Sequence, residues 1–309
     1  MARDADDVRA LAAGAAELAE LAARQSVCRA CPRLVAWREQ VAAVRRRSFQ
    51  AETYWGRPVP GWGADRPRIL IVGLAPAAHG GNRTGRIFTG DRSGDVLFES
   101  LWRCGLASQR TSVAAGDGQR LLGVRMLAAV RCAPPENKPS NAERDTCEPW
   151  FTAELDLVAA DLQVIVCLGH FAWQAAWRQL SRAGYPVPRP RPAFGHGAEI
   201  VLTGGPGSSR LSPQGSVASG GTGDPGRSQS GSGMGLSTSL STGAQRGTGA
   251  GAGTGDRPDA EDGGNAGNAG PLLVLGCYHP SQQNTFTGRV TGPMLDAVFG
   301  RARQHAGLS

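Results

Sequence analysis

Residues 69–95, ILIVGLAPAAHGGNRTGRIFTGDRSGD, are the stretch that decides the fold of this chain. The first four residues are isoleucine, leucine and valine, a pattern typical of a short strand buried on both faces of a parallel sheet. The glycine-rich, polar part that follows is typical of the loop at the carboxyl end of such a strand, where open α/β sheets bind ligands. It contains neither a P-loop nor a GxGxxG motif, and an ordinary βα connection is the alternative interpretation.

Three further apolar runs predict strands, and amphipathic patterns between them predict helices. The strands cover residues 121–130, 164–168 and 272–275, and the helices cover residues 8–24, 93–104, 171–180 and 294–303. Residues 194–202 predict an edge strand or hairpin. Four apolar strands separated by helices predict an α/β protein, a three-layer α/β/α sandwich around a mostly parallel four-stranded sheet. The loops that follow residues 69–72, 121–130 and 272–275 should open on one edge of that sheet.

Residues 204–270 differ in composition from the rest of the chain. They hold 21 of the 44 glycines and no phenylalanine, tryptophan or tyrosine. Such a segment cannot bury enough apolar surface to offset its chain entropy, so we predict a flexible, dispensable insertion. Residues 1–203 and 271–309 should then form a single α/β domain.

Charge and targeting signals point weakly to a nucleic-acid partner inside the cell. The formal net charge is +7, and the basic residues are almost all arginine, which suits phosphate contact. The N-terminus lacks the pattern of a signal peptide, and no apolar run is long enough for a membrane span. The odd count of seven cysteines does not indicate a disulfide framework. We therefore expect a cytoplasmic monomer.

Four cysteines have the spacing of a metal site. Cys28 and Cys31 form a C-x2-C pair, and Cys132 and Cys147 are candidates for the other half. A redox dithiol of the thioredoxin type would need a strand before the pair, and a helix is predicted there. Zinc and a [4Fe–4S] cluster both accept four thiolates, and spacing alone does not separate them. The remaining cysteines should be core thiols, namely Cys104, Cys167 and Cys277.

The strand-end loop, its Phe88-Thr-Gly-Asp91 sequence, the four cysteines and His279-Pro280-Ser281 together resemble the family 5 (type B) iron–sulfur uracil-DNA glycosylases. The segment at residues 73–95 resembles this family over nearly its whole length. The resemblance implies a monofunctional glycosylase that starts base excision repair by removing uracil, hypoxanthine or xanthine from DNA. It also implies a structural [4Fe–4S] cluster that staples the N-terminal helix to the sheet, with four ligands: Cys28, Cys31, Cys132 and Cys147.

Cleavage of an N-glycosidic bond makes a cationic sugar and an anionic base, so a catalyst needs a donor for the base and a group that orients water. The resemblance gives these roles to His279 and to Asp91. It makes Asn137 a second polar group for the base or the water, and Phe88 the aromatic surface under the flipped base. Backbone groups would approach the base at three small residues, Gly73, Ala75 and Ala77.

Related glycosylase families place an acidic residue or asparagine where this chain has Leu74 and Ala75. This difference moves the catalytic role to Asp91 and implies recognition of the base by shape. We expect Asp95 to be a helix N-terminal residue. Three other polar residues of the loop should either contact DNA or brace it: His79, Asn82 and Arg86.

These residues leave two alternatives to a glycosylase. One is a non-catalytic iron–sulfur protein that binds damaged or single-stranded DNA, which would tolerate the loss of Asp91 and His279. The other is a relative that traps DNA covalently, but its basic insertion is absent. Gln282 and Gln283 stand where other branches have a leucine wedge, so the residue that fills the gap of the flipped base is open.

Overall fold

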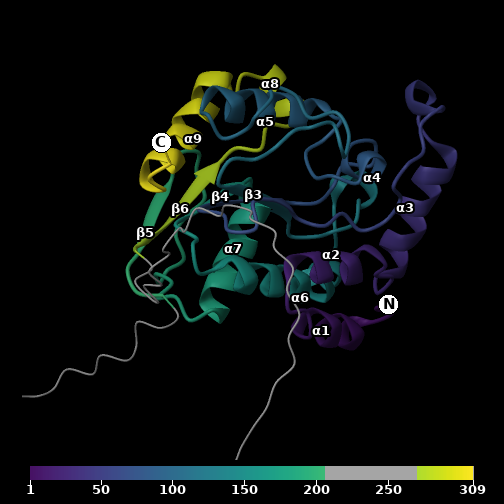
Figure 1. Ribbon diagram of the computed structural model, residues 1–309, viewed down its shortest axis with the longest axis horizontal. Coiled ribbons are helices and arrows are strands. Elements are labelled where there is room, and N and C mark those ends of the chain that lie inside the picture. Colours follow the sequence, from purple (N-terminus) through teal and green to yellow (C-terminus); the bar gives the residue numbers. More distant parts are fainter. Residues whose placement is uncertain (206–269, 309) are drawn as a thin grey trace, which may run out of the picture. The chain divides into compact units, whose positions relative to one another are not determined.

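The fold is built on a six-stranded sheet, seen in a computed structural model that describes residues 1–205 and 270–308 (Figure 1). The strands lie in the order β1-β3-β2-β4-β6-β5. Their bounds are β1 Trp62–Gly63, β2 Ile69–Gly73, β3 Val124–Ala128, β4 Val164–Leu168, β5 Glu199–Leu202 and β6 Leu272–Cys277. The predicted core of four parallel strands is confirmed. Two antiparallel edge strands, β1 and β5, widen it to six.

Strand β2 lies between the strand that follows it, β3, and the later strand β4. Ile69 pairs with Val124 of β3 on one side and with Val164 of β4 on the other, both in parallel register. The chain therefore reverses its direction of progress across the sheet between these strands. At such a switch point the loops after the strands separate, and a crevice forms at the carboxyl edge.

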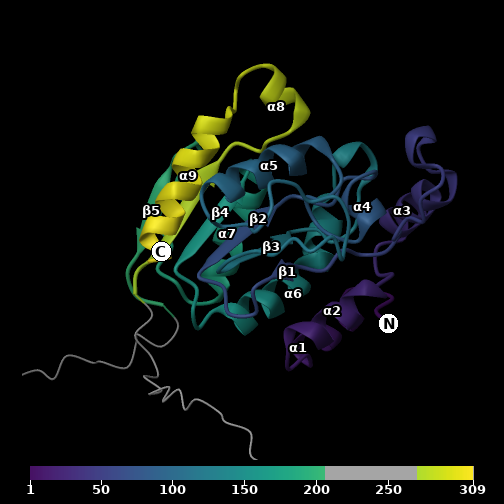
Figure 2. The same ribbon diagram turned by 45° about the horizontal axis from the view of Figure 1, so that its top comes forward.

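Helices cover both faces of the sheet. Helices α5 and α9 lie on one face and α6 and α7 on the other (Figures 1 and 2). Along β2 the side chains of Ile69 and Ile71 join the core under α5 and α9, whereas Leu70 and Val72 join the opposite core. This alternation explains why β2 is apolar at every position. The helices are α1 Ala5–Ala13, α2 Leu18–Ser26, α3 Pro32–Val44, α4 Gly81–Thr84, α5 Arg92–Arg103, α6 Asn141–Val158, α7 His170–Arg182, α8 Gln282–Phe286 and α9 Gly292–His305, with 3-10 turns η1 Arg47–Phe49 and η2 Pro135–Asn137.

The predicted core residues outside the motifs lie where we expected them. Trp173 and Trp177 are buried in the core under α7 and meet edge to face, with ring centroids 5.3 Å apart. Cys167 and Cys277 are fully buried, and Cys104 is half-buried against α9. These side chains serve packing.

The N-terminal part differs from the prediction. The single helix expected over residues 8–24 is two helices, because α1 ends at Gly14 and the carboxylate of Glu20 accepts a hydrogen bond from the N–H of Ala16 ahead of α2. Both helices pack on α6, which the sequence pattern did not predict. Helix α6 begins with a capping box, in which the side chains of Ser140 and Glu143 each bond the backbone N–H of the other.

The predicted insertion at residues 204–270 lies outside the described residues except for its first two and its last, so it stays a prediction together with the domain boundaries drawn from it. Among residues 1–205 and 270–308, the search for helices with the length and apolar character of a bilayer span found none.

Candidate active site

A pocket lies outside the carboxyl ends of β2, β3 and β6. It is lined by Leu74, Ala75, Ala77, Ile87, Phe88, Asp91, Ser93, Asn137, His279, Ser281, Gln282 and Gln283. The three loops that we predicted to open on one edge of the sheet do meet there. Of the residues predicted to bind the base or to act on it, only Gly73 is not part of the lining.

Phe88 lines this pocket, and Gly73 packs against its ring. A Cβ atom on Gly73 would lie 2.7 Å from the ring of Phe88, so the ring packs directly on the backbone at the end of β2. Phe88 is 6% exposed and has a positive φ of 53°, a conformation that costs a residue with a side chain about 1–2 kcal/mol. Its carbonyl lies against Gly94, where an added Cβ would meet it at 2.1 Å. Glycines at both positions therefore permit the placement of the ring.

Asp91 lies at the junction of this loop with helix α5. It is the N-cap of the helix, and its Oδ1 accepts a hydrogen bond from the N–H of Gly94 at 3.0 Å. Its other oxygen lies against Gly80, where a Cβ would approach it to 2.0 Å. Burial raises the pKa of Asp91, and hydrogen bonds from the first turn of the helix oppose that rise. The carboxylate is thus fixed in direction and more basic than an exposed one.

His279 follows β6 and faces Phe88, with ring centroids 5.9 Å apart. Its loop is held by the side chain of Asn284, which donates to the His279 carbonyl at 2.8 Å. Loss of hydration lowers the pKa of His279 to about 4, although part of the residue remains exposed to the pocket. The imidazole is therefore neutral at pH 7, so it can donate a hydrogen bond without carrying a charge.

Asn137 reaches the pocket from the loop after β3 and is itself exposed. Both Glu136 and Asn137 have positive φ values, 53° and 56°, between Pro135 and Pro139. Asparagine tolerates this left-handed conformation better than most residues. The turn thus brings Asn137 into the lining of the pocket.

The other polar residues of the strand-end loop brace it. His79 Nδ1 lies 3.0 Å from the hydroxyl of Tyr54, and burial lowers the pKa of this histidine. Asn82 is fully buried and donates to the carbonyl of Arg38, while Arg86 is buried in a polar network described below. Asp95 lies exposed in the first turn of α5, as expected.

Sequence reasoning missed four of the lining residues, which are Leu74, Ile87, Ser93 and Ser281. Ser93 had a usable signal, because the first turn of a helix lies beside its N-cap residue, here Asp91. Ser281 caps α8 by accepting from the N–H of Asn284 and so supports the loop of His279.

A second, small cavity is lined by all four predicted ligand cysteines. Cys28 follows α2, Cys31 precedes α3, Cys132 follows β3 and Cys147 lies in α6. Burial raises the pKa of Cys31 to about 12 and that of Cys132 to about 11, so a cation would be needed to hold them as thiolates. In the described residues no three Cys, His, Asp or Glu side chains are arranged to hold one metal ion.

Arg38 gives this cavity its charge. The side chain is 2% exposed, its Nη1 donates to Cys132 Sγ at 2.8 Å and its Nη2 donates to the carbonyl of Cys28 at 2.9 Å. The carboxylate paired with it, that of Glu39, is 4.0 Å away and 44% exposed. On the far side, the N–H of Arg131 donates to Cys147 Sγ at 3.3 Å. A buried cation with so distant a counter-ion is costly, and an anionic thiolate-bound group would compensate it.

Comparison with known proteins agrees with this geometry. The family model of the uracil DNA glycosylase superfamily matches residues 60–303. A type-5 uracil-DNA glycosylase of Mycobacterium bovis is 46% identical over 298 residues, which are 96% of this chain and 85% of that protein. The proteins of the same description from Mycobacterium leprae and Thermus thermophilus are 43% and 50% identical. The match covers 96% of this chain and all of the M. leprae protein, and 58% of this chain and 78% of the T. thermophilus protein. This chain therefore belongs to the uracil DNA glycosylase superfamily and, within it, to the type-5 enzymes.

Proposed function

We propose that this chain is a monofunctional DNA glycosylase that removes uracil from DNA by hydrolysing the N-glycosidic bond, and so acts in DNA repair. The observation that carries the proposal is the meeting of a carboxylate, a neutral imidazole and an aromatic ring in one pocket at the switch point of the sheet. Family membership agrees with it. We include in the proposal that the protein is a cytoplasmic monomer.

The departing base is an anion, so stabilising it lowers the barrier to cleavage. We assign this role to His279, which donates a hydrogen bond to the uracil O2 as charge develops there. The low pKa keeps the imidazole neutral at physiological pH, and its proton is not lost to the base. Phe88 stacks on the face of the flipped base, and the two side chains are neighbours in the pocket.

The sugar left behind is cationic and must be attacked by water. Asp91 orients this water and stabilises the cation, for which its carboxylate must be ionised. The hydrogen bond from Gly94 occupies one carboxylate oxygen and sets its direction. Asn137 supplies amide donors and an acceptor to the base or to the water from the loop after β3.

The range of substrates follows from the apolar residues of the loop after β2. Leu74, Ala75 and Ala77 line the pocket without a polar side chain. The base is therefore recognised by backbone groups and by the shape of the pocket. A purine bound there would leave no polar side chain of these residues without a hydrogen-bond partner, so the surface does not reject it on that ground. We therefore include hypoxanthine and xanthine among the substrates.

We further propose that Cys28, Cys31, Cys132 and Cys147 hold a [4Fe–4S] cluster, with Arg38 as its buried counter-ion. The fit rests on the shared cavity and on the hydrogen bonds to the sulfur atoms. When bound, such a cluster would link α2 and α3 to α6 and to the loop that carries Asn137. No step of the hydrolysis requires an electron.

The test is excision from duplex oligonucleotides that carry uracil, hypoxanthine or xanthine, followed by alkali treatment to break the strand at abasic sites. Breaks should depend on the lesion and should vanish in His279→Ala. The control is His305→Ala, because His305 bonds the carbonyl of Pro271 at the opposite end of β6. A lesion-dependent gel shift without breaks would support the non-catalytic alternative and refute the proposal.

A further inference from the structure

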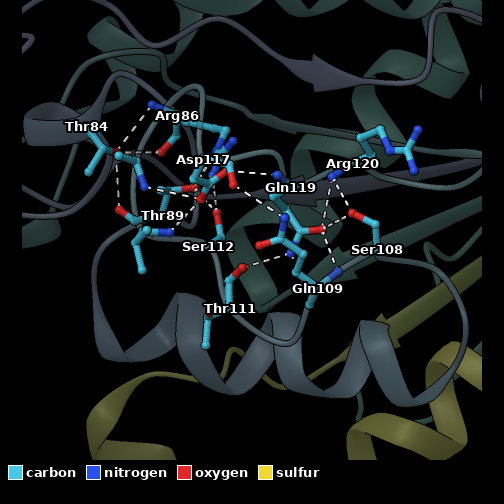
Figure 3. A network of polar contacts seen from close by, with 12 residues as sticks. Thr84, Arg86, Thr89, Ser108, Gln109, Thr111, Ser112, Asp117, Gln119 and Arg120 are labelled. Carbon is cyan, nitrogen blue, oxygen red and sulfur yellow. Dashed lines mark hydrogen bonds and ion pairs between the residues drawn. The ribbon is translucent and has the colours of Figure 1, made fainter.

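The connection between α5 and β3 contains a network of polar contacts, many more than are needed to join a helix to a strand (Figure 3). Ser112 is fully buried and Gln119 is 6% exposed. The Gln119 amide donates to the carbonyls of Gln109 and Thr111 and its oxygen accepts from Ser108 and Gln109. We call residues 106–121 the bracing loop.

Asp117 is the anionic centre of the bracing loop. Its Oδ2 accepts from Arg86 Nη2 at 2.5 Å and from the N–H of Val113 at 2.8 Å, and its Oδ1 accepts from the N–H of Gln119 at 2.9 Å. Burial alone would raise the pKa of Asp117, but the guanidinium and the backbone donors lower it to about 2. The carboxylate is thus charged at any pH at which the enzyme would be assayed.

Arg86 connects Asp117 to the segment that carries Phe88. Its Nε donates to Thr89 Oγ1 at 3.0 Å and its Nη2 to Ser112 Oγ at 2.8 Å, while the guanidinium lies 4.5 Å from the ring of Trp62. Thr89 and Ser112 are hydrogen-bonded to each other at 2.7 Å, and the N–H of Gly90 donates to the Ser112 carbonyl. The loop therefore holds the chain at residue 86 and again at residues 89 and 90.

Phe88 lies between these two anchors and has a positive φ. A non-glycine residue keeps such a conformation only where its surroundings enforce it. We propose that the bracing loop is a positioning element, in which Asp117 and Ser112 act through Arg86 and Thr89 to hold the Phe88 ring against the base. This inference rests on the proposed function, since it assigns Phe88 to base stacking.

A double-mutant cycle tests the inference. Single-turnover excision of uracil, at enzyme concentrations below saturation, is measured for Phe88→Ala, Ser112→Ala and Asp117→Asn and for each of the last two combined with Phe88→Ala. Loss of stacking should lower the rate in Phe88→Ala by about ten- to a hundredfold. Ser112→Ala and Asp117→Asn should each lower it by about three- to tenfold on their own. In the Phe88→Ala background they should have almost no further effect, because they act through the missing ring.

The control for a general loss of packing is Asp296→Asn, which breaks the ion pair of Asp296 with Arg103 between α5 and α9. It should lower the melting temperature and leave the excision rate unchanged. Ser112→Ala keeps every charge, so it remains informative if Asp117→Asn does not fold. Equal rate losses in the presence and absence of Phe88 would refute the positioning role. A wild-type protein without excision activity would instead refute the proposed function, which separates the two failures.

Discussion

Replacing His279 with glutamine should make the stability of the protein less sensitive to acid. The imidazole packs beside Phe88, the Cβ atom of His279 lies near Gly169, and loss of hydration lowers the pKa of His279 from 6.5 to about 4. In the unfolded chain the pKa returns to its ordinary value. Between these two values the unfolded state binds a proton that the folded state does not, so stability falls as the pH falls. Glutamine keeps a polar side chain at this position, and that side chain does not bind a proton in this pH range.

The magnitude follows from the two pKa values. At about pH 5 the unfolded imidazole is almost fully protonated and the folded one about one-tenth protonated, which corresponds to roughly 2 kcal/mol of destabilisation relative to neutral pH. Part of His279 meets solvent in the pocket, and this screening reduces the expected effect to about 1–2 kcal/mol. The contribution is fully present above the unfolded pKa and is lost as the pH falls toward the folded pKa.

The assay is denaturant unfolding at about pH 7.5 and about pH 5, followed by the fluorescence of the tryptophans. Wild type should lose about 1–2 kcal/mol more than His279→Gln between the two conditions, and His305→Gln should behave as wild type. An NMR titration of the imidazole gives the pKa directly. Identical pH dependence in wild type and His279→Gln, with an imidazole that titrates near 6.5, would refute the loss of hydration around His279.

Three further predictions concern the cysteines, the carboxylate and the insertion. Cys132→Ser should lose bound iron and most of its thermal stability, and an unchanged iron content would exclude Cys132 as a ligand. Asp91→Ala should slow the single-turnover excision step by about a hundredfold or more while DNA affinity changes little, whereas equal losses would indicate a purely structural carboxylate. Replacing residues 205–270 with a tight turn should leave excision within a few fold, because Leu202 and Leu272 are paired directly across β5 and β6. Abolished excision in a folded deletion variant would give the insertion a function.

Matched variants separate these effects from loss of packing. Cys104→Ser should keep its iron, because Cys104 lies against α9 and away from the cavity of the four cysteines. Asp95→Ala removes a carboxylate from the same helical turn as Asp91 but from an exposed position, so excision should persist. The pH profile of excision should fall in acid as Asp91 is protonated, at a pH above the ordinary range of aspartate, because burial raises its pKa.

The parallel core could be predicted because its strands are mostly apolar and buried on both faces, although β3 contains Arg125. Residues 164–168 match β4 at both ends, whereas β3 is shorter than the run at 121–130. The reason lies at Gly123, whose φ of 67° belongs to a turn and keeps the preceding residues out of the strand. Apolar composition marks the presence of a strand, but backbone conformation decides its ends.

The helices were less predictable where tertiary contacts define them. Helix α6 buries glutamates as well as aromatic residues, including Glu154 between Arg125 and Arg131, so its apolar stripe is broken. The capping box at Ser140 was its only local signal. Along the first helical pattern, Gly14 interrupts the chain, but a glycine within an amphipathic run does not by itself end a helix.

The candidate site likewise has a part that could be predicted from the sequence and a part that could not. Phe88, Asp91, Asn137 and His279 could be predicted to meet, because loops at the carboxyl ends of parallel strands share an edge whatever their length. The bracing loop could not, because a polar connection looks like a solvated one until its side chains are seen to be buried. Sequence thus predicts the groups that would act on the base. The contacts that fix one of them, Phe88, at a positive φ come from a segment with no motif of its own.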